Sequence, residues 1–254
     1  MSVEHRLSFL VAGAQKCGTT ALDGYLRLHP QLDMAQTKET HFFDDEVAVD
    51  WRAPDYSSLH AQFLGRPDQL RGEATPITLY WTPAHYRLLR YNPDLRFIVM
   101  LRHPTDRAWS HWRMNIRRDL DTMPFSEAIR TGRTRVLEDG EHAGLARHSS
   151  YIERGYFARQ IASLATLFPL RNMLFLRQSD LLSDPHAVLA RVASFLDIAS
   201  FPSVDHLRLN VGDTPDGTAM TTEDADYLDA LFAEDLNHLE RLTGVRLERD
   251  LTDI

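Results

Sequence analysis

The sequence predicts an α/β fold of three layers, in which helices flank a central parallel sheet. Three observations lead to this class. Short apolar runs such as Leu7–Gly13 (LSFLVAG) are typical of strands that are buried on both faces. Segments with apolar residues at helical spacing separate these runs. Strands that alternate with helices of ordinary length predict a parallel sheet.

The elements follow in chain order from the same two patterns. The first strand, Leu7–Gly13, precedes a helix over Thr19–Leu28 that the His29-Pro30 pair ends. Further strands are expected over Leu95–Leu101 (LRFIVML) and Asn172–Leu176 (NMLFL). Helices are expected over Pro83–Tyr91, Pro104–Arg118, Tyr151–Phe168, Pro185–Leu196, with Asp184 as its N-cap, and Thr222–Leu242. No linker-like composition divides the chain, so we expect one domain over residues 1–254.

Composition narrows the classes of function. The formal net charge of −8 disfavours nucleic acid as a partner. No apolar run approaches the ~18 residues of a membrane span, and the N-terminus carries Glu4, His5 and Arg6 in place of a signal-peptide core. A single cysteine, Cys17, allows no intramolecular disulfide and no cysteine metal cluster. We therefore expect a cytoplasmic protein that contacts no membrane.

A glycine-rich loop between the first strand and the first helix is the strongest motif. Gly13-Ala14-Gln15-Lys16-Cys17-Gly18-Thr19-Thr20 has the G-x-x-x-x-G spacing of a phosphate-binding loop, or P-loop. In nucleotide-hydrolysing P-loops the lysine follows the second glycine, whereas here Lys16 lies three positions earlier. Loop amides and the helix N-terminus suit an oxyanion. The candidate ligands are Gln15, Lys16, Cys17, Gly18, Thr19 and Thr20.

Two segments resemble the PAPS-dependent sulfotransferases, particularly the heparan-sulfate-type branch and its bacterial relatives. QKCGTTALDGYLRLHPQL is similar to their 5'-phosphosulfate-binding loop, and LRHPTDRAWS to their 3'-phosphate-binding segment. The resemblance implies a P-loop-type fold, 3'-phosphoadenosine 5'-phosphosulfate (PAPS) as sulfuryl donor, and adenosine 3',5'-bisphosphate as product. It places Arg102 and Ser110 on the 3'-phosphate and Lys16 on the leaving phosphate. An arginine at a strand end and a serine on the next helix can reach one phosphate.

A third segment, Lys38-Glu39-Thr40-His41-Phe42-Phe43, resembles the Glu-x-His-Phe-Phe stretch in which heparan-type enzymes keep their catalytic base. The resemblance implies Glu39 as the base. His41 is the rival, because the ordinary pKa of histidine, ~6.5, suits proton transfer better than the ~4.3 of glutamate. If the segment is extended, Glu39 and His41 point the same way. The choice between them stays open at this point.

Weaker matches and departures complete the comparison with that family. Arg154-Gly155-Tyr156 resembles an element near the donor, which makes Tyr156 a candidate ligand. Ala74, in Gly72–Pro76, stands where heparan-type enzymes often have a lysine, and residues 210–218 (NVGDTPDGT) lack the lysine of the family's nucleotide loop.

The expected reaction is transfer of a sulfuryl group to an acceptor hydroxyl or amine without a metal. A sulfuryl group carries less negative charge than a phosphoryl group, so lysine, arginine and loop amides can replace Mg²⁺. The acceptor is expected to be a small molecule or a carbohydrate; its identity and the oligomeric state are not readable. The alternatives are a P-loop nucleotide kinase or NTPase, and a nucleotide-binding protein without enzymatic activity.

Overall fold

The computed structural model describes residues 6–66, 68–139, 144–203 and 219–249. The chain forms two compact units, residues 1–101 with 160–209 and residues 102–159 with 210–254. Residues 210–218, the segment compared above with a nucleotide loop, lie outside the residues that the structure describes. The expectation of a single domain stays a prediction.

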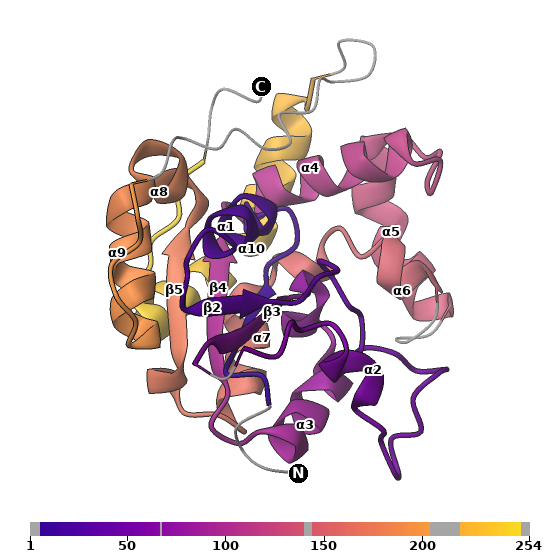
Figure 1. The fold of residues 1–254 in the computed structure, drawn as a ribbon. Coiled ribbons are helices and arrows are strands. Elements are labelled where there is room, and N and C mark those ends of the chain that lie inside the picture. Colours follow the sequence, from indigo (N-terminus) through magenta and orange to yellow (C-terminus); the bar gives the residue numbers. More distant parts are fainter. Residues whose placement is uncertain (1–5, 67, 140–143, 204–218, 250–254) are drawn as a thin grey trace. The chain divides into compact units, whose positions relative to one another are not determined.

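The first unit contains the sheet. Its five strands are β1 (Phe9–Gly13), β2 (Leu32–Met34), β3 (Leu70–Ala74), β4 (Arg96–Leu101) and β5 (Met173–Arg177). They pair in the order β2-β3-β1-β4-β5, and every pairing is parallel. Helices flank this sheet (Figure 1), so the predicted α/β class is confirmed. All residues of β1 are buried, as its apolar run predicts.

A glycine sets how closely β1 and β3 pack. Phe9 of β1 pairs with Gly72 of β3, and Leu10 pairs with Glu73. A Cβ atom at position 72 would lie 2.1 Å from Cζ of Phe9 and 2.7 Å from Sδ of Met34. Only glycine leaves room for the Phe9 ring here. The pairing places Glu73 beside Leu10 of the central strand β1, which matters for the site below.

Three helices of the first unit lie close to their predicted positions: α1 (Thr19–Leu26), α3 (Thr82–Tyr91) and α9 (Pro185–Leu196). Four shorter elements were not predicted: α2 (Ser57–His60), the 3-10 turns η2 (Pro76–Leu79) and η4 (Leu170–Asn172), and α8 (Gln178–Ser183). Asp184 caps α9 as predicted, since its Oδ1 accepts a hydrogen bond of 3.0 Å from the amide of Ala187.

The second unit is helical in its described residues. It contains α4 (Pro104–Arg117), α5 (Phe125–Asp139), α6 (Gly144–His148), η3 (Glu153–Gly155) and α10 (Thr222–Thr243). Its buried core is aromatic, with Trp109 stacked on Trp112 at 5.0 Å between ring centroids and Phe125 edge-on to Trp109 at 4.8 Å. Gly244, with φ 72°, ends α10 in the left-handed conformation usual after a helix.

One predicted helix begins later than expected. Instead of a helix over 151–168, the chain forms the short turn η3 and then α7 (Phe157–Ala165). The reason is a cap from elsewhere in the chain: Asp235 of α10 accepts hydrogen bonds from the amides of Ala158, at 2.9 Å, and Arg159, at 3.3 Å. Tyr156 therefore precedes the helix. No helix within the described ranges is long and apolar enough to span a bilayer.

Candidate active site

The glycine-rich loop connects β1 to α1 and is held by backbone hydrogen bonds, one within the loop and one to β4. The amide of Ala14 donates to the carbonyl of Met100 in β4 at 2.7 Å, and the amide of Cys17 donates back to the carbonyl of Ala14 at 3.1 Å. Lys16 has φ 69° and Gly18 has φ 85°, so the loop turns twice through the left-handed region. Lys16 thus lies at the crest of a tight turn in a conformation unusual for a lysine.

The end of this loop leaves little space for any residue but glycine. A Cβ atom at position 18 would lie 3.1 Å from Cγ of Gln178, the first residue of α8. Gly18 is also the residue before α1, and no side chain from the described part of the chain caps this helix. The first turn of α1 carries no acidic residue. An uncapped, positively polarised helix end next to Lys16 suits an anionic ligand.

The segment that carries Glu39 and His41 does not have the extended backbone considered from the sequence. Glu39 has φ 60° and His41 has φ 52°, both left-handed. The segment nevertheless joins the sheet region, because the amide of Glu39 donates to the carbonyl of Ala74 at 3.0 Å. The expected alternation of side chains was wrong, but the two side chains still face each other.

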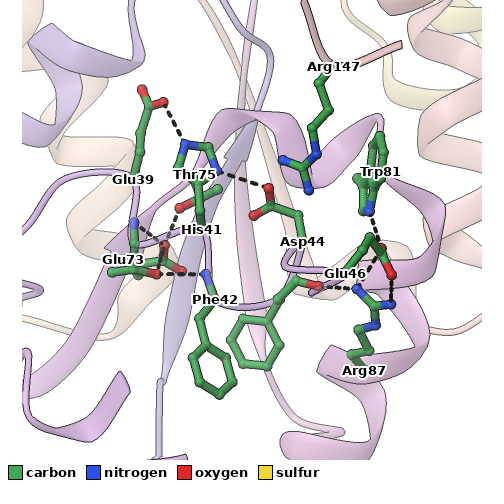
Figure 2. Close-up of polar contacts among 12 residues, drawn as sticks. Glu39, His41, Phe42, Asp44, Glu46, Glu73, Thr75, Trp81, Arg87 and Arg147 are labelled. Carbon is green, nitrogen blue, oxygen red and sulfur yellow. Dashed lines mark hydrogen bonds and ion pairs between the residues drawn. The ribbon is translucent and has the colours of Figure 1, made fainter. Parts of the chain in front are cut away.

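Figure 2 shows Glu39, His41 and Asp44 in a row. Nε2 of His41 lies 3.6 Å from Oε2 of Glu39, and Nδ1 of His41 lies 3.0 Å from Oδ2 of Asp44. The side chain of Asp44 is buried, whereas those of His41 and Glu39 are 49% and 39% exposed. Nζ of Lys38 contacts the other oxygen of Glu39, Oε1. The exposed end of the row is therefore a carboxylate whose two oxygens both face basic groups.

A third carboxylate, that of Glu73, lies close to this row. Glu73 of β3 is 1% exposed, and its Oε1 accepts hydrogen bonds from the hydroxyl of Thr40 at 2.7 Å, from the amide of Thr40 at 3.3 Å, and from the hydroxyl of Thr75. Burial raises the pKa of Glu73 above its ordinary value, and the donors from Thr75 and Thr40 act against that rise. The three donors fix its side chain in place.

The chain that follows Asp44 is fixed by Arg87 of α3. Its guanidinium donates to the carbonyl of Phe43 at 2.8 Å, pairs with Glu46 at 2.5 Å, and lies 4.2 Å from the ring centroid of Trp51. Nε1 of Trp81 also donates to Glu46, at 2.6 Å (Figure 2). Both ends of the segment from Lys38 to Glu46 are therefore held by side chains of the first unit.

The remaining predicted ligands lie in the second unit. Arg102 directly follows β4, and Ser110 lies on α4, both partly buried. Tyr156 is partly buried, and its ring meets that of Phe232 at 5.3 Å between centroids. The prediction that these residues and the Lys16 loop hold one nucleotide stays a prediction.

Three further residues of this candidate site were not predicted from the sequence. Asp44 follows His41 by three positions, a spacing at which the two side chains can meet in a turn. Glu73 was noticed only for the uncharged Ala74 beside it, and Thr40 only as the residue between the two candidates. Within the described ranges, no group of three or more histidine, cysteine, aspartate or glutamate side chains is arranged to hold a metal ion.

Comparison with known proteins gives a consistent family. The sulfotransferase domain family matches residues 7–211. Human heparan sulfate glucosamine 3-O-sulfotransferase 3B1 is 31% identical over 203 residues, which are 79% of this chain and 48% of the human protein. The chain thus spans about half the length of the curated relatives it matches.

Solved structures agree at the level of the fold. A sulfotransferase from Alicyclobacillus acidocaldarius superposes with a TM-score of 0.78 and 26% identity, covering 97% of this chain and 98% of that one. A mouse sulfotransferase complexed with PAP matches with a TM-score of 0.54 and 15% identity, covering 93% of this chain and 86% of that one. The second likeness concerns the fold alone.

Proposed function

Because this chain belongs to the sulfotransferase domain family, we propose that it transfers a sulfuryl group from PAPS to an acceptor hydroxyl or amine. The observation that carries the proposal is the loop from Gly13 to Gly18. Its left-handed turns at Lys16 and Gly18 lead into a helix end that no side chain of the described residues caps. Such an end offers backbone donors and a positive dipole to the phosphosulfate of PAPS.

The residues of the loop fit a donor of this kind. Gln15, Lys16, Thr20 and Gly18 are partly exposed, while Cys17 and Thr19 are buried. Lys16 would hold the phosphate that leaves, where a compact ammonium on a flexible stem can follow the charge as it develops. Arg102 and Ser110 would bind the 3'-phosphate, and Tyr156 would lie near the nucleotide.

Glu39 is the better arranged of the two candidate bases. Both ring nitrogens of His41 face carboxylate oxygens, of Asp44 at 3.0 Å and of Glu39 at 3.6 Å. In this position His41 can orient the carboxylate of Glu39. Lys38 contacts Oε1 of Glu39 and completes that orientation. Partial exposure of Glu39 leaves an acceptor room to approach.

PAPS supplies an activated sulfuryl group, whose bond from sulfur to the bridging phosphate oxygen breaks as the acceptor oxygen or nitrogen bonds to sulfur. Glu39 takes the proton of the attacking group, so no free hydroxide or strong base is required. Lys16 and the loop amides stabilise the negative charge that the phosphate gains. The chain thus supplies the base at one end of an in-line transfer and the cation at the other.

We propose a small metabolite or a carbohydrate as the acceptor. The net charge of −8, and the run Asp44, Asp45 and Glu46 directly after the base segment, disfavour a long polyanion such as a heparan-type polymer. This part of the proposal departs from the human relative, whose name gives heparan sulfate glucosamine as its substrate.

The test is a transfer assay with sulfur-labelled PAPS over a panel of hydroxyl and amine acceptors, run with and without EDTA. We expect label in at least one acceptor and no effect of EDTA. Label in no acceptor, together with EDTA-sensitive turnover of ATP, would support a P-loop kinase or NTPase instead.

The base is tested separately in single turnover with Glu39→Gln and His41→Ala. Loss of a general base costs roughly 100- to 10,000-fold. We expect that loss in Glu39→Gln and a smaller one in His41→Ala. A larger loss in His41→Ala would assign the base to His41.

A further inference from the structure

Two residues of the site, separated by one position, have an uncommon backbone conformation. Glu39 and His41 both have positive φ, 60° and 52°, with Thr40 between them. Non-glycine residues in this region cost of order 1–3 kcal/mol each and persist only where surrounding contacts enforce them. The contacts that enforce them here should therefore converge on Thr40.

Those contacts lead to one oxygen. Oε1 of Glu73 accepts both the hydroxyl of Thr40, at 2.7 Å, and the amide of Thr40, at 3.3 Å. The hydroxyl of Thr40 in turn accepts from the amide of Phe42 at 3.4 Å, and Phe42 is buried. Glu73 of β3 thus holds Thr40 in place. Through the hydroxyl of Thr40 it also holds the amide of Phe42 (Figure 2).

Glu73 is not itself placed to react. It is 1% exposed, and the hydroxyl of Thr75 also donates to its Oε1. A buried carboxylate is costly unless hydrogen bonds compensate it, and two threonines supply Glu73 with three hydrogen-bond donors. Because Glu73 is buried at this cost in free energy and is not exposed to an acceptor, we expect it to have a structural role.

We propose that Glu73 is a positioning residue for sulfuryl transfer: through Thr40 it holds the left-handed turn that directs Glu39 and His41 to the same place. This inference rests on the proposed function, because it assumes that Glu39 is the base. Glu73 does not contact the acceptor; it acts only through the geometry of the segment above it.

The two threonines allow a matched test. Thr40→Val and Thr75→Val each remove one hydroxyl donor from the same oxygen of Glu73 and keep the side-chain shape. Only Thr40 lies in the base segment. We expect a similar fall in melting temperature in both, but a fall in kcat of roughly 10- to 100-fold only in Thr40→Val, since small misplacements of a reacting group have effects of this order.

Three further readouts separate positioning from simple stability. The KM for PAPS should change by less than about twofold in Thr40→Val, because the loop around Lys16 is untouched. Thr40→Ser, which keeps the hydroxyl, should restore kcat, and Glu73→Gln, which keeps an accepting oxygen, should retain most of it. Equal kcat in Thr40→Val and Thr75→Val would overturn the inference.

Hydrogen exchange supplies a readout that needs no activity. The amide of Glu39, bonded to the carbonyl of Ala74, should exchange faster in Thr40→Val than in Thr75→Val. Unchanged exchange would reject the positioning role whatever the reaction. Faster exchange in Thr40→Val, found together with a wild-type protein that transfers no sulfate, would instead reject the proposed function, so the two failures are distinguishable.

Discussion

Asp44 directs Oδ2 at Nδ1 of His41 from a position without solvent exposure, at a distance of 3.0 Å. The histidine is half exposed, so the buried carboxylate determines how the exposed ring is turned. With Nδ1 held, Nε2 faces Glu39. When a carboxylate holds one ring nitrogen of a histidine, that contact sets both the tautomer and the orientation of the ring.

Replacing Asp44 should therefore lower the rate of sulfuryl transfer, because His41 would lose the contact that orients its ring. We expect Asp44→Asn to reduce kcat on the order of 10- to 100-fold, the range seen when the orienting partner of a functional histidine is lost. Single-turnover kinetics measure this effect. In a His41→Ala background the same change should add little, because the two act as one unit. Additive losses would mean that Asp44 acts independently of His41.

Lys16 should be needed for turnover more than for folding. We expect Lys16→Ala to lower kcat roughly 100- to 1,000-fold, the effect of removing one preorganised group that stabilises transition-state charge. Lys16→Arg should restore little, since a planar guanidinium does not fit a point-charge position in a tight left-handed turn. Steady-state kinetics measure the loss of turnover, and melting temperatures equal to that of the wild type show that folding is unaffected. Full activity in either variant would remove the role assigned to Lys16.

Gly18 and Gly65 form a natural pair for testing the loop. Both have positive φ, 85° and 76°, but a Cβ at Gly18 would lie 3.1 Å from Gln178, whereas one at Gly65 meets nothing within 4 Å. Each change to alanine should cost about 1–2 kcal/mol of stability from the backbone alone. Only Gly18→Ala should also weaken binding of adenosine 3',5'-bisphosphate, measured by calorimetry. Equal binding in both variants would speak against the loop as the nucleotide site.

His103, between Arg102 and Pro104, should make the protein sensitive to acid. Burial lowers the pKa of His103 to about 4, with Asp229 raising it and Arg249 lowering it. Because the folded pKa lies below the ordinary 6.5, its contribution to stability is complete above pH 6.5 and is lost as the pH falls toward 4. The loss between pH 7 and pH 5 is about 2 kcal/mol.

Denaturant unfolding of the wild type and of His103→Gln at pH 7 and pH 5 tests whether acidification destabilises the protein through His103. We expect the wild type to lose about 2 kcal/mol more than the variant on acidification. An equal loss in both proteins would show that other groups control acid stability.

The fold was predictable wherever burial alone decides the pattern. β1, β4 and β5 are nearly continuous apolar runs, and each was found within two residues of its ends. β3 was missed because its residues LRGEA include Arg71 and Glu73. Both charged side chains are buried: the Arg71 guanidinium lies 5.2 Å from the ring centroid of Phe63, and Glu73 accepts a hydrogen bond from the hydroxyl of Thr40, 33 residues earlier in the chain. β2, with three residues, is too short for any periodic signal.

The candidate site residues could be named from the sequence, but their backbone conformation could not. Short motifs identified Lys16, Glu39 and His41, because the chemistry of each type at its spacing is specific. The left-handed turns at all three depend on hydrogen bonds that the carbonyls of Met100 and Ala74 and the carboxylate of Glu73 accept from the two segments. Such partners lie tens of residues away in sequence, so no local pattern records them.

The central claim is that the Gly13–Gly18 loop with Lys16 holds the donor nucleotide. This claim can be tested without knowing the acceptor. Thermal or denaturant unfolding with adenosine 3',5'-bisphosphate at ~100 times its dissociation constant should show ~2.7 kcal/mol of added stability in the wild type. At that same concentration Lys16→Ala and Arg102→Ala should show much less. An unchanged unfolding curve in the wild type, or the same stabilisation in all three proteins, would contradict it.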